Sequence, residues 1–215
     1  MKISYVHIVK TMQSDFFEGE GFATIFGTTR RVVFKIPETV QAGDLIVAFY
    51  AGKNNGSPYL EEFEQNYAGG SSSVYFYWGV RTAIDGDAGR LIVVRRSATA
   101  ATPWITHVKV MSGISVPTGN YEKSSRATGA SVSTSISASA GIPIGAKIMI
   151  LGVALGVNDE IACSVGTKTA SGFDSENGTS FALFESEYSA TTTISPKITA
   201  SSTVERVGIF FMALW

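Results

Sequence analysis

Cysteine and histidine are scarce in this chain, and their scarcity excludes several kinds of reactive centre. Among 215 residues there is one cysteine, Cys163, and there are two histidines, His7 and His107. A single thiol rules out an internal disulfide and a cysteine-based metal site, and so few histidines cannot complete a zinc centre. No Gly-x-Ser-x-Gly elbow marks one of the many serines as a nucleophile. We therefore expect a non-enzymatic protein without cofactor or metal, in which Cys163 is a small core residue.

Charge is also sparse. Charged residues make up 16% of the chain, against about 25% in an average soluble domain, and the net charge is −1. The densest basic points are Arg30-Arg31 and Arg95-Arg96, and no longer basic run exists. Strong phosphate binding needs several clustered Lys or Arg side chains, so nucleic acid is not expected as a partner. The low charge predicts apolar surface that is covered by partner subunits in a homo-oligomer.

Long apolar runs are missing as well. No stretch reaches the roughly 18 apolar residues that a membrane-spanning helix needs, so no membrane insertion is expected. Residues 1–17 hold neither a sustained apolar segment nor a small-residue cleavage site, and no signal peptide is predicted. We expect a protein that is made in the cytoplasm and folds there.

The chain is instead rich in short segments of β type. Its most informative stretch, Arg31–Tyr50, reads as a strand ended by Pro37, a polar corner with the turn Ala42-Gly43-Asp44, and the apolar run Leu45–Tyr50. A short apolar run between turn signals favours a buried strand over a helix. Other strands are expected at residues 1–10, 71–80, 91–96, 104–111, 130–140, 147–155, 181–188, 195–200 and 204–214.

Ten or more short strands and no convincing amphipathic helix predict an all-β fold, an antiparallel β-sandwich that is jelly-roll-like, over residues 31–215. Residues 1–30 are expected to form an N-terminal strand and an arm. The arm, 14–29, packs on a neighbouring subunit or lies as a loop on its own. Residues 60–67 favour a loop over a short helix, and the polar segment 112–129 reads as a bridge.

The corner at Gly43 recurs 102 residues later, where Gly145 again precedes a long apolar run. Strand positions after the second corner also match those after the first at offsets near 100, with Val207 opposite Val108. The pattern predicts two similar halves, about 31–112 and 130–215, with loops of different length. These halves form either the two sheets of one sandwich or two small sandwiches, and we favour one jelly-roll-like domain.

Carboxylates in turns are the first candidates for a binding site. Asp85 and Asp87 lie among glycines and offer calcium ligands, as do the segments 158–160 and 174–177. None has the ligand spacing of an EF-hand loop. Ordinary turn chemistry explains each of them, and we favour that interpretation over a calcium site.

Aromatic residues in expected loops are the second candidates. Tyr59, Tyr67 and Tyr121, with Phe63 and Phe173, lie in segments that read as loops. Exposed aromatic rings stack on sugars, so the three tyrosines are possible contacts for a host-surface glycan or receptor. Packing in the core or at a subunit interface is the alternative.

Two phrases carry a family resemblance. The segment Pro37–Ala48, followed by Ser72–Trp78, resembles a β-sandwich domain that recurs in virion proteins of tailed bacteriophages, and Val207–Leu214 resembles its last strand. The resemblance implies a non-enzymatic structural component of a virus particle, in the tail, the baseplate or the capsid decoration. It implies contacts with copies of itself and with other virion proteins, and a location in the virion. Residues 1–30 have no counterpart in it.

Overall fold

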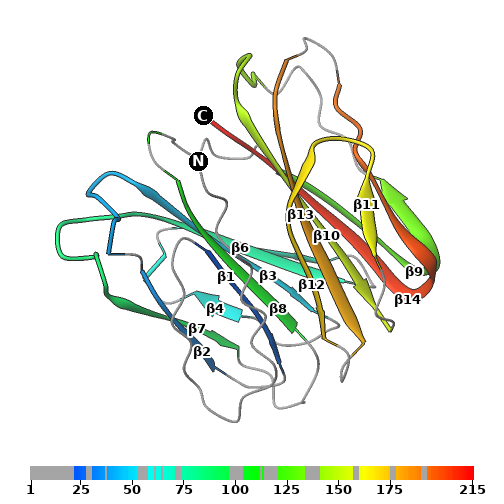
Figure 1. The fold of residues 1–215 in the computed structure, drawn as a ribbon, viewed down its shortest axis with the longest axis horizontal. Helices are drawn as coiled ribbons and strands as arrows, with labels where there is room; N and C mark the ends of the chain where they lie inside the picture. Colours follow the sequence, from blue (N-terminus) through cyan, green and yellow to red (C-terminus); the bar gives the residue numbers. More distant parts are fainter. Residues whose placement is uncertain are drawn as a thin grey trace. The chain divides into compact units, whose positions relative to one another are not determined.

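The computed structural model describes residues 22–27, 31–36, 38–52, 58–60, 62–63, 65–70, 74–96, 104–111, 113, 121–133, 141–156, 160–174, 178–189 and 193–215 (Figure 1). Every regular element in these segments is a β-strand, and every strand pairing is antiparallel. The prediction of a helix-poor, sandwich-like all-β fold is confirmed. The jelly-roll connections and the duplication of two halves stay predictions, and the strand expected at 1–10 lies outside the described residues.

The strands follow the chain in this order: β1 Phe22–Gly27, β2 Arg31–Lys35, β3 Leu45–Gly52, β4 Pro58–Leu60, β5 Gln65–Gly70, β6 Tyr75–Thr82, β7 Leu91–Arg96, β8 Trp104–Met111, β9 Tyr121–Ser133, β10 Lys147–Leu155, β11 Ile161–Cys163, β12 Thr167–Asp174, β13 Thr179–Glu187 and β14 Lys197–Leu214.

The chain divides into two compact units. The first comprises Met1–Gly69 and Tyr75–Ile114, and the second comprises Gly70–Val74 and Ser115–Trp215. In the first unit, a five-stranded sheet has the order β1-β8-β3-β6-β5 and a three-stranded sheet has the order β2-β7-β4. In the second unit, one sheet has the order β11-β14-β10-β13-β12, with β9 paired to β14.

One strand lies at the centre of each larger sheet, and each is apolar on both faces. Residues 45–49 of β3 and 148–155 of β10 are all buried. A strand covered on both faces carries a continuous apolar run instead of an alternating one, as both runs do in the sequence. The burial explains why these two segments stand out in a chain whose other strands are more polar.

The same three-strand arrangement surrounds both central strands. β3 pairs with β6 and β8, and β10 pairs with β13 and the end of β14. The positions that begin these ladders are Leu45, Thr82 and Met111 in the first unit and Lys147, Glu187 and Leu214 in the second. Counted from the start of each ladder, Phe211 takes the position of Val108, so the expected match of Val207 with Val108 is four residues off.

The core of the second unit lies between the central sheet and a covering layer made by β11 and the start of β14. A Cβ atom built on Gly152 of β10 would lie 2.8 Å from Cδ1 of Ile198 and 3.0 Å from Cγ2 of Ile161. Both isoleucines are buried in the same apolar cluster as Ile150 and Phe211. Gly152 is therefore the point at which the missing side chain lets the covering layer approach the sheet closely.

Three expectations about loops are wrong. Residues 22–27 of the expected arm form β1, which pairs with β8, and both ends of the loop expected at residues 60–67 belong to strands, β4 and β5. The expected bridge 112–129 contains most of β9, a polar strand that pairs with β14. The residues of β9 have a low intrinsic preference for strands, but pairing with the partly apolar β14 provides backbone hydrogen bonds that hold β9 extended.

The two strands expected at 195–200 and 204–214 are one strand, β14. The exposed Ser201-Ser202-Thr203 segment has the composition of a turn, but the chain stays extended through it. The register with β9 shifts between Thr199 and Val204, so an irregularity in the ladder accommodates the polar segment without ending the strand.

Candidate functional site

Two successive glycine turns follow β6 and bring charged side chains together. The N–H of Asp87 donates to the carbonyl of Ile84 at 3.1 Å, and the N–H of Arg90 donates to the carbonyl of Asp87 at 3.0 Å. The third residue of each turn is a glycine with positive φ, Gly86 at 88° and Gly89 at 73°. Glycine adopts this conformation without a steric penalty, so the two turns fold the chain back on itself around Asp87.

Asp87 lies at the centre of a cluster of four charges, which we call the charged corner: Glu62, Arg81, Asp87 and Arg90. The guanidinium Nη2 of Arg81 donates to both carboxylate oxygens of Asp87, at 2.6 and 2.7 Å. Nη1 of Arg81 donates to Oε2 of Glu62 at 3.0 Å and to its backbone carbonyl at 3.4 Å. Arg90 bonds both carboxylates, with its Nη1 at 3.2 Å from Oδ1 of Asp87 and its Nη2 on Oε2 of Glu62.

Burial makes these contacts structurally important. Asp87 is 1% exposed and Arg81 is 7% exposed, whereas Glu62 and Arg90 reach solvent. Desolvation by burial alone would raise the pKa of Asp87, but hydrogen bonds from Arg81, from the N–H of Ile84 and from Arg90 outweigh it and hold that pKa below the ordinary 3.8. A buried ion pair held by several hydrogen bonds fixes geometry, and removing one partner leaves an uncompensated charge.

Glu62 reaches the charged corner from a strained backbone. Its φ is 69°, the only positive φ of a non-glycine residue in the described segments. A non-glycine residue in this conformation costs about 1 kcal/mol or more and persists when its surroundings hold it there. Both arginines bond its side chain, and Arg81 also bonds its carbonyl. The charged corner thus connects the segment before β5 to the end of β6.

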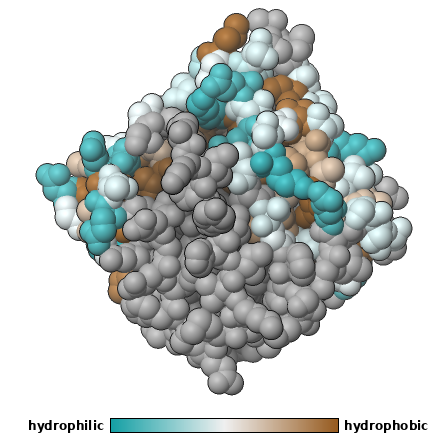
Figure 2. Space-filling view, in the orientation of Figure 1, coloured by the Kyte–Doolittle hydropathy of each residue, from teal (hydrophilic) through white to brown (hydrophobic). Residues whose placement is uncertain are grey.

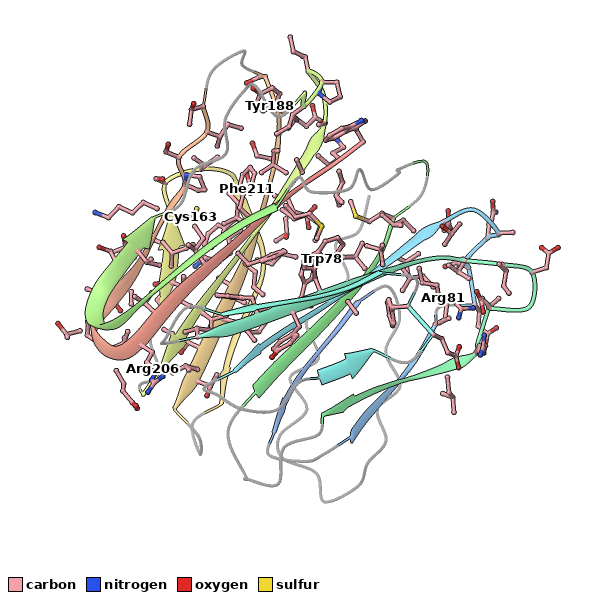
Figure 3. The ribbon with its side chains drawn as sticks, turned by 180° about the vertical axis from the view of Figure 1, so that it is seen from behind. Trp78, Arg81, Cys163, Tyr188, Arg206 and Phe211 are labelled. Atoms are coloured by element: carbon pink, nitrogen blue, oxygen red, sulfur yellow. The ribbon has the colours of Figure 1, made fainter. Side chains whose placement is uncertain are left out.

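The corner at Gly43 in the first unit and the corner at Gly145 in the second share a pair of backbone hydrogen bonds but differ in their side chains. The N–H of Gly43 donates to the carbonyl of Ala83 and the N–H of Ala83 donates to the carbonyl of Asp44, at 2.8 and 2.7 Å. The corresponding pair of bonds in the second unit joins Gly145 to Tyr188 and Tyr188 to Ala146, at 2.7 and 2.8 Å. Figure 3 shows Arg81 in the first unit and Tyr188 in the second. Tyr188 is buried in the apolar core of its unit.

One polar contact of the first corner has an apolar equivalent in the second. Oδ2 of Asp44 accepts a hydrogen bond from the N–H of Gln41 at 2.9 Å. The equivalent of Gln41 is Pro143, which has no N–H, and the equivalent of Asp44 is Ala146. Neither corner leaves an unpaired N–H at this position: the Asp44 carboxylate accepts from the Gln41 N–H in the first corner, and Pro143 has no N–H in the second.

This exchange predicts a compensating pair of substitutions. Replacing Asp44 by Ala leaves the Gln41 N–H without its acceptor and should lower the free energy of unfolding by about 1–2 kcal/mol. Adding Gln41→Pro to that variant removes the orphaned donor and should recover most of the loss. Urea unfolding of the two single variants and the double variant measures the coupling; additive losses would contradict the equivalence of the corners.

The three candidate tyrosines lie in strands, so their expected position in loops is wrong. Tyr59 is in β4 and pairs with Arg95, Tyr67 is in β5, and Tyr121 is in β9 and pairs with Met212. Tyr59 and Tyr67 belong to different sheets of the first unit, and Tyr121 belongs to the second unit. The structure thus does not gather the three into one loop cluster.

Asp87 is also not available as a calcium ligand in this arrangement, because arginine donors and a backbone N–H occupy both its oxygens. Among the described residues no group of three or more His, Cys, Asp or Glu side chains is placed to hold a metal ion. The partly buried Cys163 packs against the apolar core of the second unit, and desolvation raises the pKa of its thiol. That environment suits a structural cysteine.

Sequence reasoning did not predict the charged corner. Its one sequence signal is Arg81, an arginine inside the apolar run of β6, which needs a carboxylate partner if the position is buried. The partner Asp87 lies six residues away across two turns, and Glu62 lies in a segment read as a loop. Spacing alone does not connect these three residues.

Large apolar side chains are exposed near the charged corner and near the corner at Gly145. Ile84 is 58% exposed next to the charged corner, and Ile144 is 71% exposed in the turn that leads into β10. Leu91, at the start of β7, is also exposed. On the face drawn in Figure 2, the described residues show mostly hydrophilic surface with smaller apolar areas between.

In the described segments no helix has both the length and the apolar character that crossing a bilayer requires. No model of a known protein family matches the chain, and no curated protein sequence matches it.

Proposed function

We propose that this chain is a non-enzymatic structural component of a tailed-bacteriophage virion, either a tail or baseplate appendage or a capsid decoration protein. It assembles with copies of itself and with other virion proteins, after synthesis in the host cytoplasm. The proposal rests on the resemblance of Pro37–Ala48 and Ser72–Trp78 to virion β-sandwich domains. The antiparallel, helix-poor fold of the described residues agrees with such a domain.

The observation that supports a non-enzymatic role is that the carboxylates of the charged corner are bonded to arginines and to a backbone N–H. Both oxygens of Asp87 accept hydrogen bonds from Arg81, Arg90 and the Ile84 N–H. Glu62 bonds both arginines in turn. A general acid or base must be free to exchange a proton with a substrate, whereas these carboxylates are engaged in closing a turn. The cluster therefore supports a role in rigidity.

We include in this proposal that the chain is a tandem of two related β units. The shared ladders around β3 and β10, and the shared corner bonds at Gly43 and Gly145, support it. The exchange of Gln41 and Asp44 for Pro143 and Ala146 supports it further, since both residues change together. A tandem of this kind presents two similar corners, each with an exposed isoleucine nearby, to neighbouring proteins.

Assembly gives a testable outcome. Light scattering after size exclusion should show an oligomer of the full chain, and Ile144→Ser should shift the population toward monomer by removing apolar contact area. Thr169→Ser is the matched control, because it changes an exposed strand residue of the same unit conservatively. A wild-type monomer at all concentrations, together with absence from purified particles, would contradict the proposal.

The alternative, a carbohydrate- or host-receptor-binding module, is tested on the same protein. A glycan array read with wild type and with Tyr59→Ala, Tyr67→Ala and Tyr121→Ala distinguishes the two functions. Saturable binding lost in one of these variants favours the module. Oligomerisation without glycan binding favours the structural component.

A further inference from the structure

The two units differ in the polar side chains that they bury. The buried charged side chains among the described residues are Asp44, Arg81 and Asp87, and all three belong to the first unit. The buried polar side chains described in the second unit are those of Thr179 and Ser180, which carry no charge. The second corner is closed by Tyr188 and Ala146 within the apolar cluster.

We propose that the charged corner is an acid-released latch: below about pH 4, protonation of Asp87 leaves Arg81 buried without its counter-charge, and the first unit opens while the second stays folded. The latch ties three segments, since Arg81 at the end of β6 holds Glu62 on one side and the turn at Asp87 on the other. Its release frees all three together.

The charged groups around Asp87 come from several segments. Arg81 of β6 and Arg90 of the second turn bond it directly, and Glu62 bonds both arginines. Asp85 lies in the same turn, and the carboxylate of Glu38 lies against Gly89, 2.6 Å from the position a Cβ would take there. With four carboxylates and two guanidinium groups, the site has an excess of negative charge at neutral pH.

The direction of the pH effect follows from the lowered pKa of Asp87. A carboxylate whose pKa is lower in the folded protein than in the unfolded chain stabilises the fold above the unfolded value. That stabilisation is complete above about 3.8 and is lost as the pH falls through the lower, folded value. The first unit is therefore destabilised as the pH falls below about 4, and its stability does not depend on the titration of Asp87 near neutral pH.

One described carboxylate of the second unit, that of Glu187, also has a lowered pKa. A hydrogen bond from Lys147 and the charge of Lys147 lower the pKa of Glu187. This pair lies on the surface, where water screens the two charges and an ion pair contributes little to stability. It therefore serves as the matched control for the buried pair.

Nuclear magnetic resonance on the ¹⁵N-labelled full chain tests the latch at residue resolution. Between pH 7 and pH 2.5, amide signals from β6 should lose their native positions at a higher pH than signals from β10 and β13. Simultaneous loss of all signals, or earlier loss from β10, would overturn the proposal.

Two variants of the charged corner and one control variant identify the groups responsible. Arg81→Met with Asp87→Leu replaces the buried pair by apolar side chains and should bring the two acid transitions together. Asp87→Asn, a smaller change, should weaken the first unit at pH 7 and flatten its dependence on pH below 4. Lys147→Ala with Glu187→Ala should leave the interval between the two transitions unchanged. An interval that persists in Asp87→Asn would overturn the assignment to Asp87 even if the apolar double variant fails to fold.

Discussion

Arg81→Met should lower the free energy of unfolding at pH 7 by about 3–5 kcal/mol, the largest effect that we expect from a single substitution in this chain. The substitution removes the donor to both oxygens of Asp87, which stays 1% exposed, and also releases Glu62. Arg90 and the Ile84 N–H compensate only in part. Urea unfolding followed by circular dichroism measures the loss.

Arg90→Met is the matched control for this prediction. Arg90 bonds the same two carboxylates, but its side chain is 40% exposed, so its loss should cost no more than about 1 kcal/mol. If both arginine variants lose the same stability, burial is not what makes the Arg81 contacts important. If Arg81→Met unfolds at the wild-type urea concentration, the charged corner does not hold the first unit together.

Gly152→Ala should destabilise the second unit by about 1–3 kcal/mol, because the added methyl group enters a filled space. The new Cβ would lie 2.8 Å from Cδ1 of Ile198 and 3.0 Å from Cγ2 of Ile161, both closer than carbon atoms pack. Each isoleucine is fully buried and has little room to move. Thermal unfolding of the variant measures the shift.

Ile198→Val provides the control for Gly152→Ala, since it removes the Cδ1 atom that the new methyl group meets. On its own Ile198→Val should cost about 1 kcal/mol. Combined with Gly152→Ala, it should cost less than the sum of the two single losses, because the shortest of the new contacts, with Cδ1 of Ile198, is removed. Additive losses would show that the covering layer does not approach the sheet at Gly152.

The sequence predicted the all-β class and the two central strands because those features are local. Leu45–Tyr50 and Lys147–Leu155 are apolar runs bounded by turn residues, and burial on both faces of a sheet requires such runs. The corner glycines Gly43 and Gly145 were also readable, since their positive φ demands glycine in a turn.

The errors arose where a partner strand decides the structure. β9 is polar and contains Gly129, and its own residues favour a loop, but pairing along β14 makes it a strand. β14 contains Ser201-Ser202-Thr203, which has the composition of a turn, yet the ladder continues across it through a register shift. Neither outcome is visible in the composition of the segment itself.

The charged corner was not predictable for a related reason. Arg81, Asp87 and Glu62 come from three separate segments, and two glycine turns bring the first two together. Asp87 looked like a calcium ligand because acidic residues among glycines favour both turns and cation binding. Whether Asp87 closes a turn or binds a cation depends on the arginines that donate to it. The spacing of these residues in the sequence did not reveal that contact.

Mass spectrometry and electron cryomicroscopy of purified virus particles test the proposed function most directly. The account predicts that the full chain is present in many copies, as ordered β-sandwich density in contact with identical copies and with another virion protein. The absence of the chain from those particles, combined with turnover of a host polysaccharide by the purified protein, would contradict it.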